Sequence, residues 1–135
     1  MRQVNFPAGG IKELNQMADV LLIDDEEHYL KSLAEGLRLY SKKLNIITAE
    51  NGKKAIEILS TTAVDVVVTD LNMPGMNGYE FLHHLQQTHP DLPVIIMSAC
   101  SQASVDAHLK NLRFAQYIEK PLNLDDIARA ILSVV

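Results

Sequence analysis

The chain has 135 residues, 47% of them hydrophobic and 21% charged, which is typical of one domain that buries a core without a disulfide or a metal. Its 12 basic and 17 acidic residues leave a net charge of −5, which disfavours direct binding to nucleic acid because phosphate backbones would repel most of the surface. One cysteine excludes an intramolecular disulfide, and no apolar run approaches the roughly 18 residues that a membrane span requires, so we expect a cytoplasmic protein.

Residues 1–17 show no sustained apolar period and contain Pro7 and the Gly9-Gly10 pair. We interpret them as an N-terminal extension, with a short helix around Ile11–Gln16 and no legible function. From Ala18 to Val135 the sequence is patterned as a single domain.

Three short apolar runs in this domain each lead into a polar residue: Val20–Ile23, Val66–Val68 and Val94–Met97. Runs that are apolar on both faces are typical of buried parallel strands. Two weaker strands are predicted at Leu44–Ala49 and Gln116–Glu119.

Amphipathic segments lie between the predicted strands. The first keeps helical spacing through Leu30, Leu33, Ala34 and Leu37, and the last begins near Leu124, with Asn123 as its N-cap. Shorter helices are predicted at Lys53–Leu59, Tyr79–Thr88 and Ser104–Leu112. Five strands in strict alternation with five helices indicate an α/β fold, a doubly wound parallel sheet with helices on both faces.

Polar residues follow the predicted strands where each strand ends. They are Asp24, Asp25, Asp70, Ser98 and Lys120. Because the carboxyl ends of parallel strands share one edge, and ligands bind there at the switch point in strand order, we expect these side chains to form one site.

Three carboxylates within about 5 Å of one another repel by roughly 3 kcal/mol per pair at an effective dielectric near 20, so a cation is needed. Ligation by oxygen alone suits Mg²⁺, with Mn²⁺ as a second choice. The remaining metal positions are open to phosphate oxygens, for which Lys120 offers a charge and Ser98 a hydroxyl donor. One carboxylate could itself attack phosphorus to form an aspartyl phosphate.

The ordered set of motifs resembles the receiver domains of bacterial response regulators. The motifs are Asp24-Asp25, Asp70-Leu-Asn-Met-Pro-Gly-Met-Asn-Gly78, Ser98-Ala99 and Lys120-Pro121. The resemblance covers residues 18–135, and it implies a flavodoxin-like sheet with the strand order 2-1-3-4-5.

The resemblance implies a metal set on the acidic residues. Asp25 and Asp70 would bind Mg²⁺ directly, Asp24 would act largely through water, and Asn72 would contribute its backbone carbonyl.

The resemblance also implies a phosphorylation switch. Asp70 would be the phosphoacceptor, Lys120 and Ser98 would each hold a phosphoryl oxygen, and the peptide before Pro121 would be cis. Tyr117 occupies the aromatic switch position and would turn in from solvent. The surface that moves would be the helix near Ser104–Leu112, the last strand and the last helix.

Two positions depart from the family pattern. Arg113 stands where family members commonly carry glycine, so the turn into the last strand is expected to differ in shape. Ser98 replaces the commoner threonine but keeps the hydroxyl.

The expected function is a phosphoacceptor that takes its phosphoryl group from a histidine kinase or a histidine phosphotransfer protein. It would be a switch that catalyses its own phosphorylation and dephosphorylation, not a metabolic enzyme. Its target would be a downstream protein or an output domain outside these 135 residues, and homodimerisation through the last helices stays open.

Two other functions remain open. A Mg²⁺-dependent phosphohydrolase of the dehalogenase type also uses a strand-end aspartate, but it needs a second acid where this chain has Asn72. A phosphate-independent interaction module is disfavoured by the full set of polar residues at the strand ends.

Overall fold

A computed structural model describes residues 2–3, 17–73 and 75–135; the short helix expected at 11–16 lies outside them. The elements, in chain order, are β1 (Arg2–Gln3), β2 (Ala18–Ile23), α1 (Glu27–Tyr40), β3 (Leu44–Ala49), α2 (Gly52–Thr61), β4 (Val66–Asp70), α3 (Gly78–Thr88), β5 (Val94–Ser98), α4 (Gln102–Leu109), β6 (Arg113–Phe114), β7 (Gln116–Glu119) and α5 (Leu124–Val134). Five of the strands form a parallel sheet in the order β3-β2-β4-β5-β7. This confirms the predicted fold class and the strand order 2-1-3-4-5.

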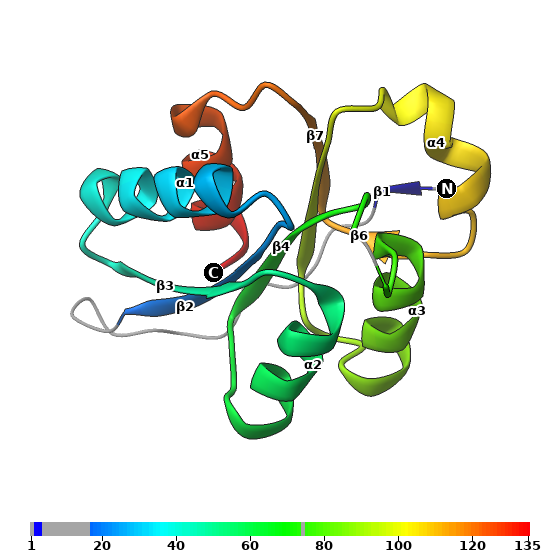
Figure 1. Cartoon of the computed structure of the whole chain (residues 1–135), viewed down its shortest axis with the longest axis horizontal. Helices are drawn as coiled ribbons and strands as arrows, with labels where there is room; N and C mark the ends of the chain where they lie inside the picture. Colours follow the sequence, from blue (N-terminus) through cyan, green and yellow to red (C-terminus); the bar gives the residue numbers. More distant parts are fainter. Residues whose placement is uncertain (1, 4–16, 74) are drawn as a thin grey trace.

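Two hydrophobic clusters lie on opposite faces of this sheet, because successive side chains of a strand point to opposite sides. In β2, Val20 and Leu22 belong to one cluster, and Leu21 and Ile23 belong to the other. The first cluster includes the buried faces of α1 and α5, and the second includes those of α2, α3 and α4. Figure 1 shows α1 and α5 together on one side of the sheet and α2 and α3 on the other.

The strand register aligns the carboxyl ends of the central strands. Ile23 pairs with Thr69, Asp70 with Met97, and Ser98 with Glu119. The residues that follow β2, β4, β5 and β7 therefore share one edge of the sheet. The chain reverses its direction of winding between β2 and β4, so the switch point lies between Asp24 and Asp70.

The fourth helix differs from its prediction. It spans Gln102–Leu109, not Ser104–Leu112, because the Ser101 hydroxyl caps its start by accepting the Ser104 N–H at 3.3 Å. Asn111 ends the turn after it with φ of 71°, a left-handed conformation that asparagine tolerates.

The chain after this helix also differs from expectation. Arg113, which stands at the expected glycine, lies in the short strand β6, and β6 pairs in parallel with β1. Part of the N-terminal extension thus contacts the domain. In the described part of the chain, no helix is long and apolar enough to cross a membrane.

Candidate functional site

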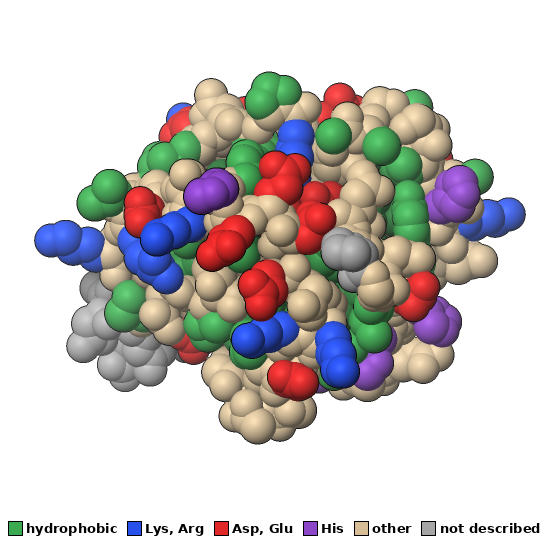
Figure 2. All heavy atoms as spheres, in the orientation of Figure 1, with side chains coloured by type: hydrophobic (Ala, Val, Ile, Leu, Met, Phe, Trp, Pro, Cys, Tyr) green, Lys and Arg blue, Asp and Glu red, His purple; other side chains and the backbone are tan. Residues whose placement is uncertain are grey.

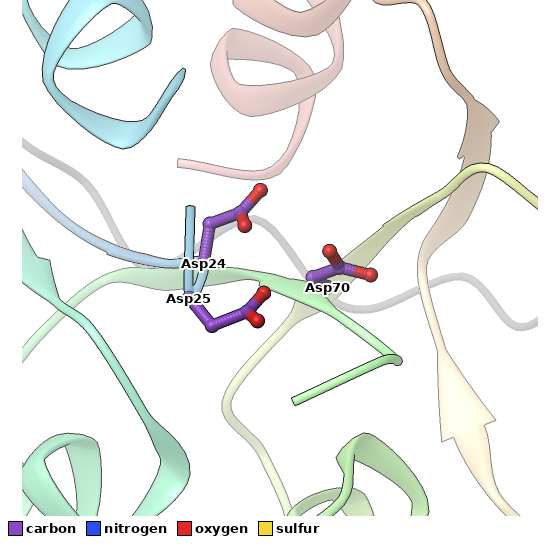
Figure 3. A group of neighbouring side chains, drawn as sticks. All are labelled: Asp24, Asp25 and Asp70. Carbon is purple, nitrogen blue, oxygen red and sulfur yellow. The ribbon is translucent and has the colours of Figure 1, made fainter. Parts of the chain in front are cut away.

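Asp24, Asp25 and Asp70 gather at the switch point. One carboxylate oxygen from each lies within 4.8 Å of the others. Figure 3 shows Asp24 and Asp25 just after β2, with their carboxylates on the side where Asp70 ends β4. Asp24 and Asp70 are buried, whereas Asp25 is exposed. The cluster therefore has two buried acids and one acid that reaches solvent.

Short turns orient the two buried carboxylates. Asp24 Oδ1 accepts the Glu26 N–H at 3.0 Å, and Asp70 Oδ1 accepts the Asn72 N–H at 3.1 Å. An aspartate that accepts the amide two residues later forms a turn that fixes its own side chain. In each case this leaves the second oxygen, Oδ2, facing the centre of the site.

Lys120 bridges the two buried acids. Its Nζ donates to Asp24 Oδ2 at 2.8 Å and to Asp70 Oδ2 at 2.9 Å. Burial alone would lower the pKa of Lys120, but the two hydrogen bonds and the carboxylate charges outweigh burial and raise it. The Lys120 N–H donates to the Ser98 carbonyl at 2.7 Å, and the Lys120-Pro121 peptide is cis, as expected. The ammonium is therefore held charged between both acids.

The donor set fits a hard divalent cation. The three side chains of the cluster each offer a carboxylate oxygen, the ligand type that Mg²⁺ prefers. Three carboxylates and one ammonium leave two negative charges at the cluster, a charge that one divalent ion neutralises. Figure 2 shows acidic side chains gathered near the middle of this face, with basic side chains around them. This acidic cluster is typical of a Mg²⁺ site.

Ser98 and Tyr117 lie on the adjacent strands β5 and β7. Ser98 is fully buried, and its Oγ accepts the Cys100 N–H at 3.1 Å. The Tyr117 hydroxyl donates to the Cys100 carbonyl at 2.7 Å, and its ring packs edge-on against Phe114. Burial raises the pKa of Tyr117, and the neighbouring Ser98 hydroxyl offsets part of that rise. Tyr117 is thus half-buried against the loop after β5 rather than pointing into solvent.

The loop after Asp70 folds back onto its own strand. Leu71 and Met73 are buried, whereas Asn72 is exposed. The Gly78 N–H donates to the Leu71 carbonyl at 2.9 Å, so the start of α3 lies directly against the end of β4. This contact fixes the backbone that carries Asp70.

One residue near the site was missed in the sequence interpretation. The Tyr29 ring lies beside Lys120, with its centroid 4.6 Å from Nζ. Burial raises the pKa of Tyr29, and the Lys120 charge offsets part of the rise. Its position in the first turn of α1, four residues after Asp25, was the available signal, since such a residue lies over the strand ends.

Comparison with known proteins relates most of this chain to one protein family. The family model for the response regulator receiver domain matches residues 20–132. The chain is 33% identical over 114 residues to the transcriptional regulatory protein GlrR of Escherichia coli K12, and 35% identical over 113 residues to the DNA-binding transcriptional regulator NtrC of the same strain. These matches cover 84% and 82% of this chain, but only 25% and 23% of the relatives. The chain therefore spans about a quarter of the length of these curated relatives.

A solved structure is similar along nearly the same length. The response regulator TrrA of Thermotoga maritima, determined in complex with Mg²⁺ and beryllofluoride, superposes with a TM-score of 0.78 at 27% identity. The match covers 88% of this chain and all of TrrA. The sheet fold of this chain is therefore shared with a response regulator that was determined together with Mg²⁺ and beryllofluoride.

Proposed function

The chain belongs to the response regulator receiver domain family, and from this premise we propose that Asp70 accepts a phosphoryl group from a histidine kinase or a histidine phosphotransfer protein. A receiver domain is a signalling switch, which is turned on by phosphorylation and turned off by dephosphorylation. We propose residues 18–135 as the receiver unit, residues 1–17 as an extension, and the cytoplasm as its location.

The observation that carries this proposal is the Lys120 bridge. A single ammonium contacts Asp24 and Asp70, the two buried acids at the switch point, at 2.8 and 2.9 Å. Asp70 is a buried carboxylate at the end of a strand, it is paired with a cation, and the solvent-exposed Asp25 lies beside it. A carboxylate in this setting is well suited to attack phosphorus. An ordinary turn aspartate would have neither the burial nor the cation.

The transfer is a displacement at phosphorus. An oxygen of the Asp70 carboxylate attacks the phosphorus, and an O–P bond forms as the N–P bond of phosphohistidine breaks. The imidazole nitrogen keeps the electron pair of the broken bond. Hydrolysis reverses the switch: a water oxygen attacks the phosphorus, the bond to Asp70 breaks, and inorganic phosphate leaves. The chain contributes mainly position and charge to both steps.

Four residues are proposed to hold the metal. Asp25 and Asp70 bind it directly, Asp24 acts largely through water, and the Asn72 backbone carbonyl completes the set. When bound, Mg²⁺ supplies positive charge that offsets the carboxylates and the phosphoryl oxygens. Mn²⁺ has the same preference for oxygen ligands and is the alternative ion.

The output of the switch is proposed to lie around β5 and β7. Ser98 hydrogen-bonds a phosphoryl oxygen, and this pulls on the loop whose carbonyl at Cys100 accepts the Tyr117 hydroxyl. This change would alter the surface formed by α4, β7 and α5. That surface would then bind a downstream protein, an output domain or a second copy of the chain more tightly.

Two observations favour a receiver over the other functions considered. The position two residues after Asp70 holds Asn72, an exposed amide, where a dehalogenase-type phosphohydrolase needs an acid. A phosphate-independent interaction module would not need an ammonium bridging two buried carboxylates.

A titration with beryllofluoride and Mg²⁺ tests this proposal. Amide chemical shifts of the wild type should saturate at one equivalent of this aspartyl-phosphate mimic, and Asp70→Asn should not respond. Asp65→Asn, which changes an acid just before β4, is the matched control and should respond as the wild type does. Saturation of Asp70→Asn at the same concentration would overturn the assignment.

A further inference from the structure

Tyr29 approaches the site from a different element than the acids do. It lies in the first turn of α1, packs against the hydrophobic cluster beneath that helix, and presents its ring to Lys120. The centroid of the ring lies 4.6 Å from Nζ, within the range of a cation–π contact. The ammonium therefore has an aromatic contact as well as its two carboxylates.

Two carboxylates and one aromatic ring surround the Lys120 ammonium. Two of its N–H groups point to Asp24 Oδ2 and Asp70 Oδ2. Among the described residues these carboxylates are its hydrogen-bond acceptors, and the ring supplies its third contact. Only 14% of the Lys120 side chain is exposed, so little water competes for this position. A desolvated cation–π contact is stronger than an exposed one.

The hydroxyl of Tyr29 does not hold the ring in place. Tyr29 Oη is buried, and it has no hydrogen-bond partner among the described residues, although the Leu122 backbone lies nearby. Among the described residues the ring is therefore held by apolar packing and by its contact with Lys120. What the residue contributes to Lys120 is its aromatic face, which phenylalanine also has.

We propose that Tyr29 is a positioning residue, which holds the Lys120 ammonium over the attacked phosphorus by supporting it on the face of its ring. This inference rests on the proposed function of Asp70. During transfer the ammonium must exchange a carboxylate contact for a phosphoryl oxygen, and a four-carbon side chain has many other conformations available. The contact between the ammonium and the Tyr29 ring can persist throughout the transfer, because the ring takes no part in the reaction.

The rate of phosphorylation by acetyl phosphate with Mg²⁺ tests the proposal. Tyr29→Leu keeps an apolar side chain but removes the ring, and it should label about 5- to 30-fold more slowly, the factor for a partly desolvated cation–π contact. Tyr29→Phe should label within about two-fold of the wild type, because phenylalanine keeps the ring face and the hydroxyl makes no hydrogen bond to the described residues. Tyr40→Leu removes a ring from the far end of the same helix and should leave the rate unchanged.

Two further measurements separate positioning from folding. Tyr29→Leu should keep its Mg²⁺ affinity, and its urea midpoint should show it fully folded under the labelling conditions. In a Lys120→Met background, Tyr29→Leu should cause no additional loss of rate. Labelling of Tyr29→Leu at the wild-type rate, an equal loss in Tyr29→Phe, or the same fold-loss with and without Lys120 would each overturn the proposal. Failure of the wild type to label would instead overturn the role of Asp70.

Discussion

Gly78 is the residue of the site that tolerates no side chain. A Cβ at this position would lie 2.4 Å from Leu71 Cα and 2.8 Å from the Asp70 carbonyl oxygen. Both neighbours are backbone atoms, which cannot move aside as the end of a side chain can. The close approach lets α3 begin directly against β4, so this glycine fixes the position of the backbone at Asp70.

Gly78→Ala should therefore destabilise the protein by about 1–3 kcal/mol, the usual cost of forcing extra atoms into a packed region. Gly36→Ala is the matched control, because its Cβ would meet only the flexible Leu124 side chain, at 3.2 Å, and alanine favours a helix. Urea unfolding of both variants measures the difference. Equal urea midpoints for the two variants would show that the loop between β4 and α3 accommodates the added Cβ without a loss of stability.

The polar residues of the site were predictable because they follow strands. Apolar runs mark the central strands, and parallel strands end at one edge. Asp24 follows β2, Asp70 ends β4 and Lys120 follows β7, so all three lie at that edge. Tyr29 was harder to predict, because its one signal was its position in the first turn of an amphipathic helix, and a tyrosine there has no chemical pattern of its own. Its contact with Lys120 depends on how α1 packs over the strand ends, which is a tertiary property.

At the level of elements, the strands and long helices were predicted well and α4 was predicted poorly. The central strands are apolar on both faces, and α1 buries four residues with regular spacing. Helix α4 buries only Val105 and Leu109, so its apolar pattern is weak and its bounds depend on the local chemistry of Ser101 and Asn111. The pairing of β1 with β6 involves two residues in each strand, too few for any periodicity.

Helix α4 should be the element that responds most to the phosphoryl mimic. It has eight residues and two buried side chains, so packing stabilises it less than α1 or α5. Amide hydrogen exchange in α4 should be faster than in α1 without ligand, and beryllofluoride with Mg²⁺ should change α4 and β7 most. The contrary result would be amide protection in α4 equal to that in α5, with ligand-induced changes confined to the loops that carry Asp24, Asp25 and Asp70. The output surface would then lie elsewhere.

At the level of the whole molecule, the pKa values of all four tyrosines are raised, as is that of Lys120. Burial is the main cause for three tyrosines, and a hydrogen bond to Asp125 is the main cause for Tyr40. Each group binds its proton more tightly in the folded chain than in the unfolded one. The stability that they contribute is complete below the ordinary tyrosine pKa of 10.0 and is lost as pH rises through the folded values.

Tyrosinate absorbance measures this directly. The titration midpoint of the folded protein should lie above that of the protein unfolded in urea, and the free energy of unfolding should fall as pH rises above about 10. Coinciding midpoints would mean that neither burial nor the hydrogen bond between Tyr40 and Asp125 favours the protonated tyrosines in the folded chain.

The most direct test of the proposed switch is the chemistry of Asp70 itself. Incubation with acetyl phosphate and Mg²⁺ should add one phosphoryl group to the intact protein, hydroxylamine should remove it as expected for an acyl phosphate, and borohydride reduction followed by peptide mapping should locate it at residue 70. Asp70→Asn should gain no such group. A hydroxylamine-resistant label, or a label at another residue in the wild type, would contradict the assignment of Asp70 as the phosphoacceptor.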